Sequence, residues 1–147
     1  MIFICLEIIN ANKNKKMDAH HKMFHAIEKE NIEEIKLLLP EITNKYAFSP
    51  KSSTTYMNVA SWVGNTEIIE LLYLHNFDIN FASYDAETPL MTAISCNKIE
   101  CVKFLLKLGA NPRFMSKKGI SAYFIAMICK NEKIKKYYRM EKIMISN

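Results

Sequence analysis

The residues best suited to bind a metal ion are three histidines, His20, His21 and His25. Residues four apart share one face of a helix, so the imidazoles of His21 and His25 could hold one ion together. A stable site needs three or four ligands, and no Asp, Glu or Cys stands at the spacing of a metal motif. We therefore expect these side chains to be solvated in the first turn of a helix, and we assign the chain no metal and no cofactor.

Cysteine thiols could serve as nucleophiles when they are deprotonated. The four cysteines are Cys5, Cys96, Cys101 and Cys129, and none forms a C-x-x-C pair. Cys101 lies among apolar residues, and Cys96 has no histidine near it in the repeat pattern to act as a base. The sequence also lacks a Gly-rich phosphate loop and a G-x-S-x-G motif. These features predict a protein that is not an enzyme.

Composition predicts one globular domain. The chain has 147 residues, of which 50% are hydrophobic and 24% are charged, a balance that excludes wholesale disorder. Only 3 Gly and 4 Pro are present, too few for a turn-rich β-sandwich or barrel. No apolar run reaches the roughly 18 residues of a membrane-spanning helix. The apolar opening lacks the basic residues and cleavage site of a secretory leader, so we expect an intracellular protein with reduced thiols.

The net charge of +5 is concentrated in the last part of the chain. From Lys117 to Lys142, eight basic residues stand against two acidic ones, whereas residues 1–116 carry a net charge of −1. Only 2 of the 20 basic residues are Arg, the better side chain for reading phosphates and bases. The near-neutral main body therefore argues against a nucleic-acid partner.

Two blocks of sequence recur with a period of about 33 residues, which indicates an internal repeat. The first block reads small hydroxyl, variable, large apolar, variable, variable, Ala in Thr55–Ala60, Thr88–Ala93 and Ser121–Ala126. A fourth copy, Met23–Ala26, precedes its counterpart Met57–Ala60 by one period and one extra residue. The second block, a polar turn followed by a helix pattern, recurs in the same register at Gly64–Leu72 and Asn97–Leu105, and Glu30–Leu38 repeats the pattern.

The chemistry of one unit explains its spacing. Thr88 can cap a helix with its hydroxyl, and Pro89 suits the first helical position, where no N–H is needed. Leu90 and Ala93 then share one face, and the small Ala lets a neighbouring helix approach closely. Gly109 follows the second helix, where a left-handed residue is expected. Each unit is thus predicted to be a helix–turn–helix.

The unit from Thr88-Pro89-Leu90-Met91-Thr92-Ala93 to Leu105-Leu106-Lys107-Leu108-Gly109-Ala110-Asn111 closely resembles an ankyrin repeat. The resemblance covers roughly residues 19–140 and implies an all-α solenoid of about four helix–turn–helix repeats joined by short hairpin loops. We expect a non-repeat extension at 1–16, a single domain at 17–142 and a tail at 143–147. The repeats are expected at about 19–50, 51–83, 84–116 and 117–142.

The sequence departs from the ankyrin pattern at several positions. Phe24, Asn58, Met91 and Phe124 replace the family's His, which puts its usual hydrogen bonding in question. Ala86 replaces a turn Gly, which predicts a distorted turn. In the last unit Tyr137 and Tyr138 replace the Leu pair, as expected of a degraded cap with a more polar outer face. We also expect Met17 to be the start of the protein or of its ordered part.

The resemblance implies a non-enzymatic module that binds an unidentified protein through its concave face and hairpin tips. Outward positions fall late in each first helix, including Glu28, and at the hairpin tips, including Glu87. Trp62, the only tryptophan, is placed on the concave face, where exposed aromatic residues make good anchors. The alternative is that Trp62 packs against its own hairpin. The candidate binding residues are Trp62, Val63, Phe81, Tyr84, Asp85, Ser95 and Ile128.

A basic cap suggests an alternative function, contact with nucleic acid or an anionic membrane surface. The candidate patch comprises Lys117, Lys118, Lys133, Lys135, Lys136 and Arg139. The simpler explanation is that a terminal helix needs charge for solubility. We expect a monomer located in the cytoplasm, or inside the host cell if the source is a virus or an intracellular pathogen. A decayed repeat fragment is a third explanation of the imperfect units.

Overall fold

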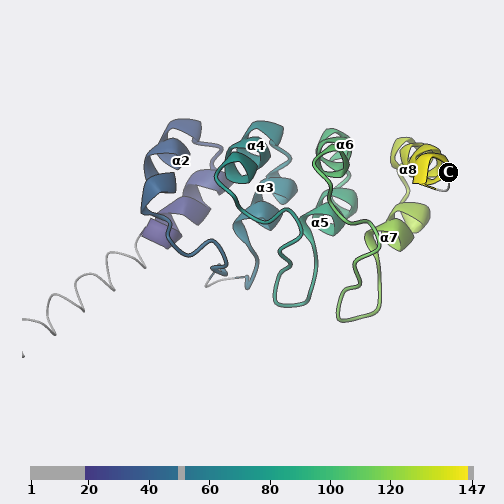
Figure 1. Ribbon diagram of the computed structural model, residues 1–147, viewed down its shortest axis with the longest axis horizontal. Coiled ribbons are helices and arrows are strands. Elements are labelled where there is room, and N and C mark those ends of the chain that lie inside the picture. Colours follow the sequence, from purple (N-terminus) through teal and green to yellow (C-terminus); the bar gives the residue numbers. More distant parts are fainter. Residues whose placement is uncertain (1–18, 50–51, 146–147) are drawn as a thin grey trace, which may run out of the picture.

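The computed structural model describes residues 19–49 and 52–145, and it shows successive pairs of antiparallel helices stacked along one axis (Figure 1). The first pair is formed by residues 19–28 and α2 (Ile32–Leu38), which is followed by the short 3-10 helix η1 (Leu39–Glu41). The later pairs are α3 (Tyr56–Val63) with α4 (Thr66–Leu74), α5 (Pro89–Ser95) with α6 (Ile99–Lys107), and α7 (Ala122–Ile128) with α8 (Glu132–Ile145). The predicted all-α solenoid is confirmed.

The same type of cap starts the first helix of three consecutive units. The hydroxyls of Thr55, Thr88 and Ser121 accept a hydrogen bond from the backbone N–H three residues later. Successive caps lie one repeat apart in the sequence. The repeat in the sequence therefore marks where the first helix of each unit begins. The expected cap at Thr88 and the placement of Pro89 at the start of α5 are both present.

Left-handed residues shape the turns of each unit. Gly64 and Gly109 follow helices with φ of 93° and 92°, a region that favours glycine. Ala86 takes φ of 57° in the hairpin where a Gly was expected. The hairpin still closes, because the N–H of Ser83 donates to the Glu87 carbonyl at 2.9 Å and the N–H of Ala86 to the Ser83 carbonyl at 2.8 Å. The missing Gly therefore strains one residue and leaves the hydrogen bonds of the turn intact.

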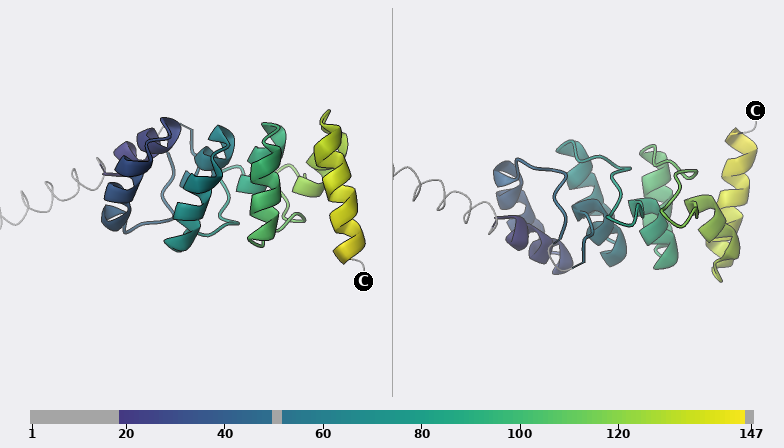
Figure 2. Two further views of the ribbon diagram at one scale, coloured as in Figure 1. Left: turned by 90° about the horizontal axis from the view of Figure 1, so that it is seen from above. Right: turned by 90° about the horizontal axis from the view of Figure 1, so that it is seen from below.

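One continuous apolar seam joins the units. Leu90, Ala93 and Leu105 of one unit are fully buried, as are their counterparts Ala60 and Leu72 of the preceding unit. Helix α5 packs between α3 and α7, and the views in Figure 2 show the second helices in a row along the stack. Burial against neighbours stabilises each short helix more than its own propensity does.

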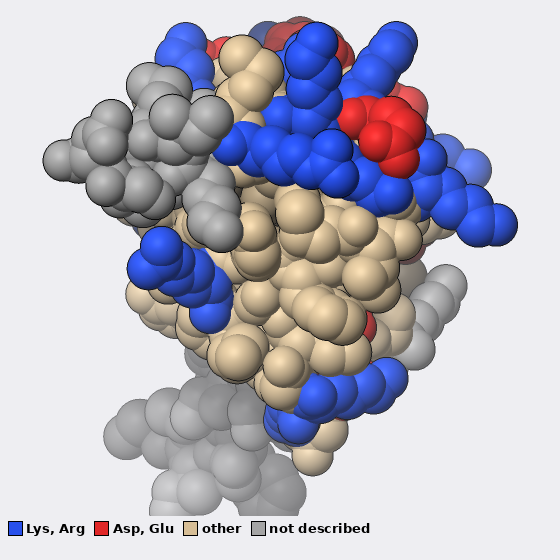
Figure 3. Space-filling view, turned by 90° about the vertical axis from the view of Figure 1, so that its right-hand side faces the viewer, with Lys and Arg blue, Asp and Glu red and all other residues tan. Residues whose placement is uncertain are grey.

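The C-terminal end face differs from the polar cap expected of a terminal repeat. Phe124 is 52% exposed, although its counterparts Met91 and Asn58 are 1% and 2% exposed because a further helix pair covers them. Ile128 and Met140 are exposed as well. Figure 3 shows uncharged residues across the centre of this face and lysine and arginine side chains above, beside and below them. The charged side chains of the C-terminal unit thus lie around the edge of the end face and not at its centre.

The domain boundaries expected from sequence are covered only in part. The extension at 1–16 and the prediction for Met17 lie outside the described residues. Helix α8 extends to Ile145, past the boundary expected at residue 142. Within it, Tyr138 occupies the position of Leu105 and is 3% exposed, so it fills the same place in the core.

Candidate protein-binding site

A row of exposed side chains runs along the ends of the first helices. Trp62, Ser95 and Ile128 occupy equivalent positions of successive repeats, at the ends of α3, α5 and α7. All three are exposed, Trp62 by 57% and Ile128 by 64%. Val63, beside Trp62, is partly buried against the core. The repeat therefore brings three of the predicted binding residues into one line.

Backbone hydrogen bonds join successive hairpins into a continuous row. The N–H of Tyr84 donates to the carbonyl of Ser53 at 3.0 Å, and the N–H of Lys117 donates to the carbonyl of Asp85 at 3.1 Å. The Tyr84 side chain is 66% exposed, and the Lys117 ammonium lies 3.6 Å from the centre of its ring. Since a backbone hydrogen bond ties each of these hairpins to the next, their tips form a continuous edge beside the first helices.

Phe81 is less accessible to a binding partner than the other predicted binding residues. Its ring meets Tyr46 edge-on with centroids 4.9 Å apart, and it lies 5.5 Å from the ring of Phe48 in the preceding hairpin. The three aromatic rings form a small cluster between hairpins, and Phe81 is partly buried within it. Phe81 thus contributes mainly to the hairpin row.

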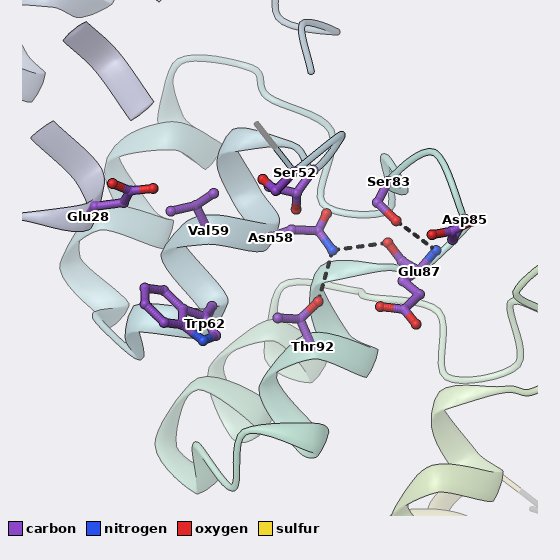
Figure 4. Close-up of a pocket in the computed structure, with 10 residues that line it drawn as sticks. Glu28, Ser52, Asn58, Val59, Trp62, Ser83, Asp85, Glu87 and Thr92 are labelled. Atoms are coloured by element: carbon purple, nitrogen blue, oxygen red, sulfur yellow. Dashed lines mark hydrogen bonds between the residues drawn. The ribbon is translucent and has the colours of Figure 1, made fainter. Parts of the chain in front are cut away.

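A groove opens between the helix ends and the hairpins, and we call it the Trp62 groove (Figure 4). Its volume is about 370 Å³. Trp62 and Glu28 line one side, Asp85 and Glu87 line the other, and Asn58 lies between them. The full set of lining residues is Glu28, Ser52, Thr54, Asn58, Val59, Trp62, Ser83, Asp85, Glu87 and Thr92.

Asn58 fixes the floor of the groove. Its amide Nδ2 donates to the Glu87 carbonyl at 3.0 Å and to Thr92 Oγ1 at 2.9 Å, and its Oδ1 accepts from the Thr55 hydroxyl at 2.5 Å. The side chain is 2% exposed and connects α3, α5 and the hairpin between them. Asn58 therefore supplies hydrogen bonds where the family's His was missing, and it does so between units.

The predicted basic patch is divided between two parts of the structure. Lys117 and Lys118 belong to the last hairpin, at the lower edge of the stack, whereas Lys133, Lys135, Lys136 and Arg139 lie on α8 at the upper edge (Figure 1). Lys135 donates to Glu132 at 2.8 Å, and this bond lowers the pKa of the Glu132 carboxyl. Uncharged residues fill the centre of the end face between these edges (Figure 3). Contact with nucleic acid or a membrane stays an untested prediction.

The histidines do not all stay in solvent. His20 is half-buried, hydrogen-bonds the Tyr56 hydroxyl through Nδ1 and stacks on its ring, so the expectation that it is solvated is wrong. The packing of α3 against the first helical turn brings Tyr56 to His20, and the pattern of residues within one helix does not show this contact. His21 and His25 are exposed. In the part of the chain that the structure describes, no three His, Cys, Asp or Glu side chains are grouped to hold a metal ion.

The cysteines of the described segments differ in environment. Cys101 is buried in α6, and desolvation raises the pKa of its thiol to about 11. Cys96 and Cys129 are half-buried free thiols. A thiol with so high a pKa is protonated at neutral pH and packs as a small apolar side chain.

The family follows from a match between residues 56–138 and the model described as "Ankyrin repeats (3 copies)". The chain belongs to the ankyrin repeat family. The resemblance drawn from the repeated units is thereby confirmed, and ankyrin repeats in general mediate protein–protein interaction. No helix among the described residues is long and apolar enough to cross a membrane.

Relatives of this ankyrin repeat chain occur in proteins of several kinds. Protein phosphatase 1 regulatory subunit 12A of Mus musculus is 33% identical over 76 residues, which cover 52% of this chain and 7% of that protein. The fowlpox virus ankyrin repeat protein FPV022 is 24% identical over 131 residues, covering 83% and 21%. Glycerophosphocholine phosphodiesterase gde1 of Schizosaccharomyces pombe is 51% identical over 45 residues, covering 31% and 4%. The chain spans less than a quarter of each of these relatives.

The sequence pattern does not indicate several of the residues that line the Trp62 groove. Glu28 and Glu87 occupy outward positions of the repeat, but their closeness to Trp62 depends on how three units stack and is not visible in the sequence. Asn58 and Thr92 were assigned to no site, since the bond between them spans 34 residues. The repeat alignment pairs Asn58 with Met91, so it places Asn58 next to the turn of α5 that holds Thr92 but does not identify the bond itself.

Proposed function

We propose that this chain is a non-enzymatic module that binds a partner protein through its concave face and hairpin tips. The observation that carries the proposal is Trp62, which is 57% exposed beside a groove although it is the only tryptophan in the chain. An exposed indole buries a large area on binding and has few torsions to freeze, so it contributes strongly to affinity. Tyr84 and Ile128, also exposed, extend the surface along the stack.

The architecture supports the same proposal. Stacked units give an extended surface, and the tied hairpins hold its edge rigid, which lowers the entropic cost of binding. One matching relative is named a regulatory subunit, a role that works through contact with another protein. We place the module inside a cell as a monomer, in the cytoplasm or in a host cell, and the free thiols of Cys96, Cys101 and Cys129 support that location.

The proposal can be tested with binding proteins that are selected from a displayed library of protein fragments. We expect Trp62→Ala to weaken the selected binders at least tenfold, about 1.4 kcal/mol, with an unchanged melting temperature. Tyr73→Ala is the matched control, because Tyr73 is an exposed aromatic residue on α4, outside the groove. Binders that tolerate Trp62→Ala and Tyr84→Ala would contradict the proposed surface.

A further inference from the structure

The Trp62 groove is acidic in a chain whose net charge is +5. Among the described residues that line it, Glu28, Asp85 and Glu87 are acidic and none is Lys or Arg. All three carboxylate residues are exposed, as is the indole of Trp62. The groove therefore combines an aromatic face with negative charge on both of its sides (Figure 4).

We propose that the groove receives a lysine or arginine side chain from an extended segment of the partner protein. This inference rests on the proposed function and specifies the chemistry of the partner. A cation is attracted to the face of an indole ring, and the attraction grows when the site is closed off from water. Carboxylates on the opposite side provide charge-assisted hydrogen bonds to the same ammonium or guanidinium group.

Other occupants fit the groove less well. An acidic side chain would face three carboxylates of like charge, which costs free energy at short range. A purely apolar side chain would remove water from the polar lining, which includes Ser52, Ser83 and Thr92, without replacing its hydrogen bonds. A basic side chain satisfies the charges and can place its aliphatic stem against Val59 and Trp62.

The hairpin side of the groove is already ordered for this contact. The backbone N–H of Glu87 donates to Ser83 Oγ at 3.2 Å, and the Glu87 carbonyl accepts from Ser83 N–H at 2.9 Å and from Asn58 Nδ2 at 3.0 Å. With its backbone held by these bonds, Glu87 extends its side chain toward the groove from a fixed Cα position. Such preorganisation favours one ligand geometry and reduces the entropy lost on binding.

Random dodecapeptides selected by display on the full chain provide the probe. Trp62 is the only tryptophan, so its fluorescence reports occupancy of the groove by peptides that lack tryptophan. We expect the selected peptides to contain a Lys or Arg whose replacement by Gln weakens binding about tenfold. Glu87→Gln with Asp85→Asn should weaken the same peptides to a similar degree. Glu70→Gln, which removes an exposed carboxylate on α4, is the charge control and should have no effect.

The outcomes separate the two proposals. Peptides that depend on Trp62 but tolerate loss of their basic residues, or tolerate the paired Asp85 and Glu87 substitutions, would overturn the basic-side-chain inference and leave the binding surface in place. A selection that yields no Trp62-dependent peptide would contradict the binding surface and, with it, this inference. Non-additive losses when the peptide and protein changes are combined would support direct contact between the two charges.

Discussion

Asn58→Ala offers a sharp test of how the units are joined. The side chain makes three hydrogen bonds, to Thr55, to Thr92 and to the backbone of Glu87, and it is 2% exposed. At about 1 kcal/mol for each bond, the substitution should cost ~3 kcal/mol of unfolding free energy. The cost stays near this value because the partners keep other bonds, for example from Thr92 Oγ1 to the Thr88 carbonyl at 3.3 Å.

Urea denaturation followed by circular dichroism measures this loss. For a chain of this length, ~3 kcal/mol corresponds to a fall of about 6–12 °C in the melting temperature. Ser95→Ala is the control, because Ser95 is exposed at the end of α5 and should change stability by less than about 0.5 kcal/mol. A loss below about 1 kcal/mol for Asn58→Ala would refute the assignment of Asn58 as the polar link between units.

Three further predictions follow from burial and backbone conformation. Met91→Lys should abolish cooperative unfolding, because Met91 is 1% exposed and the substitution buries a charge. Phe124→Lys at the matching, exposed position should lower the free energy of unfolding by less than about 1 kcal/mol. Thermal melts of the two variants measure this difference. Ala86→Gly should raise stability by ~0.5–1 kcal/mol in urea titrations, because glycine relieves the strain of φ 57°. Stability should fall between pH 9 and 11, because the unfolded chain loses the Cys101 proton near the usual pKa of a thiol, whereas burial in the folded state raises that pKa to about 11. Cys101→Ala should reduce this slope in denaturant titrations at each pH.

The regular parts of the fold could be predicted because they repeat. The caps at Thr55, Thr88 and Ser121 and the apolar seam recur once in each unit, so each unit supports the interpretation of the others. The row of Trp62 and Ser95 followed from the same register. Local chemistry and spacing were sufficient wherever neighbouring units are alike.

The features that the sequence did not reveal depend on differences between units. The contact of His20 with Tyr56 and the link from Asn58 to Thr92 join side chains 36 and 34 residues apart that have no counterparts in the other repeats. The exposure of Phe124 is also specific to its unit, because within the described structure no further helix pair covers it, whereas Met91 and Asn58 at the matching positions are covered. Irregular positions require the three-dimensional arrangement.

The exposure of Trp62 before and after binding tests the central claim most directly. Acrylamide quenching of the single tryptophan should be efficient in the free chain, because Trp62 is 57% exposed there. Quenching should fall strongly when a selected protein partner is bound, because the indole then lies within the interface. A tryptophan that is already protected in the free chain, or one that stays equally accessible in the complex, would contradict the account.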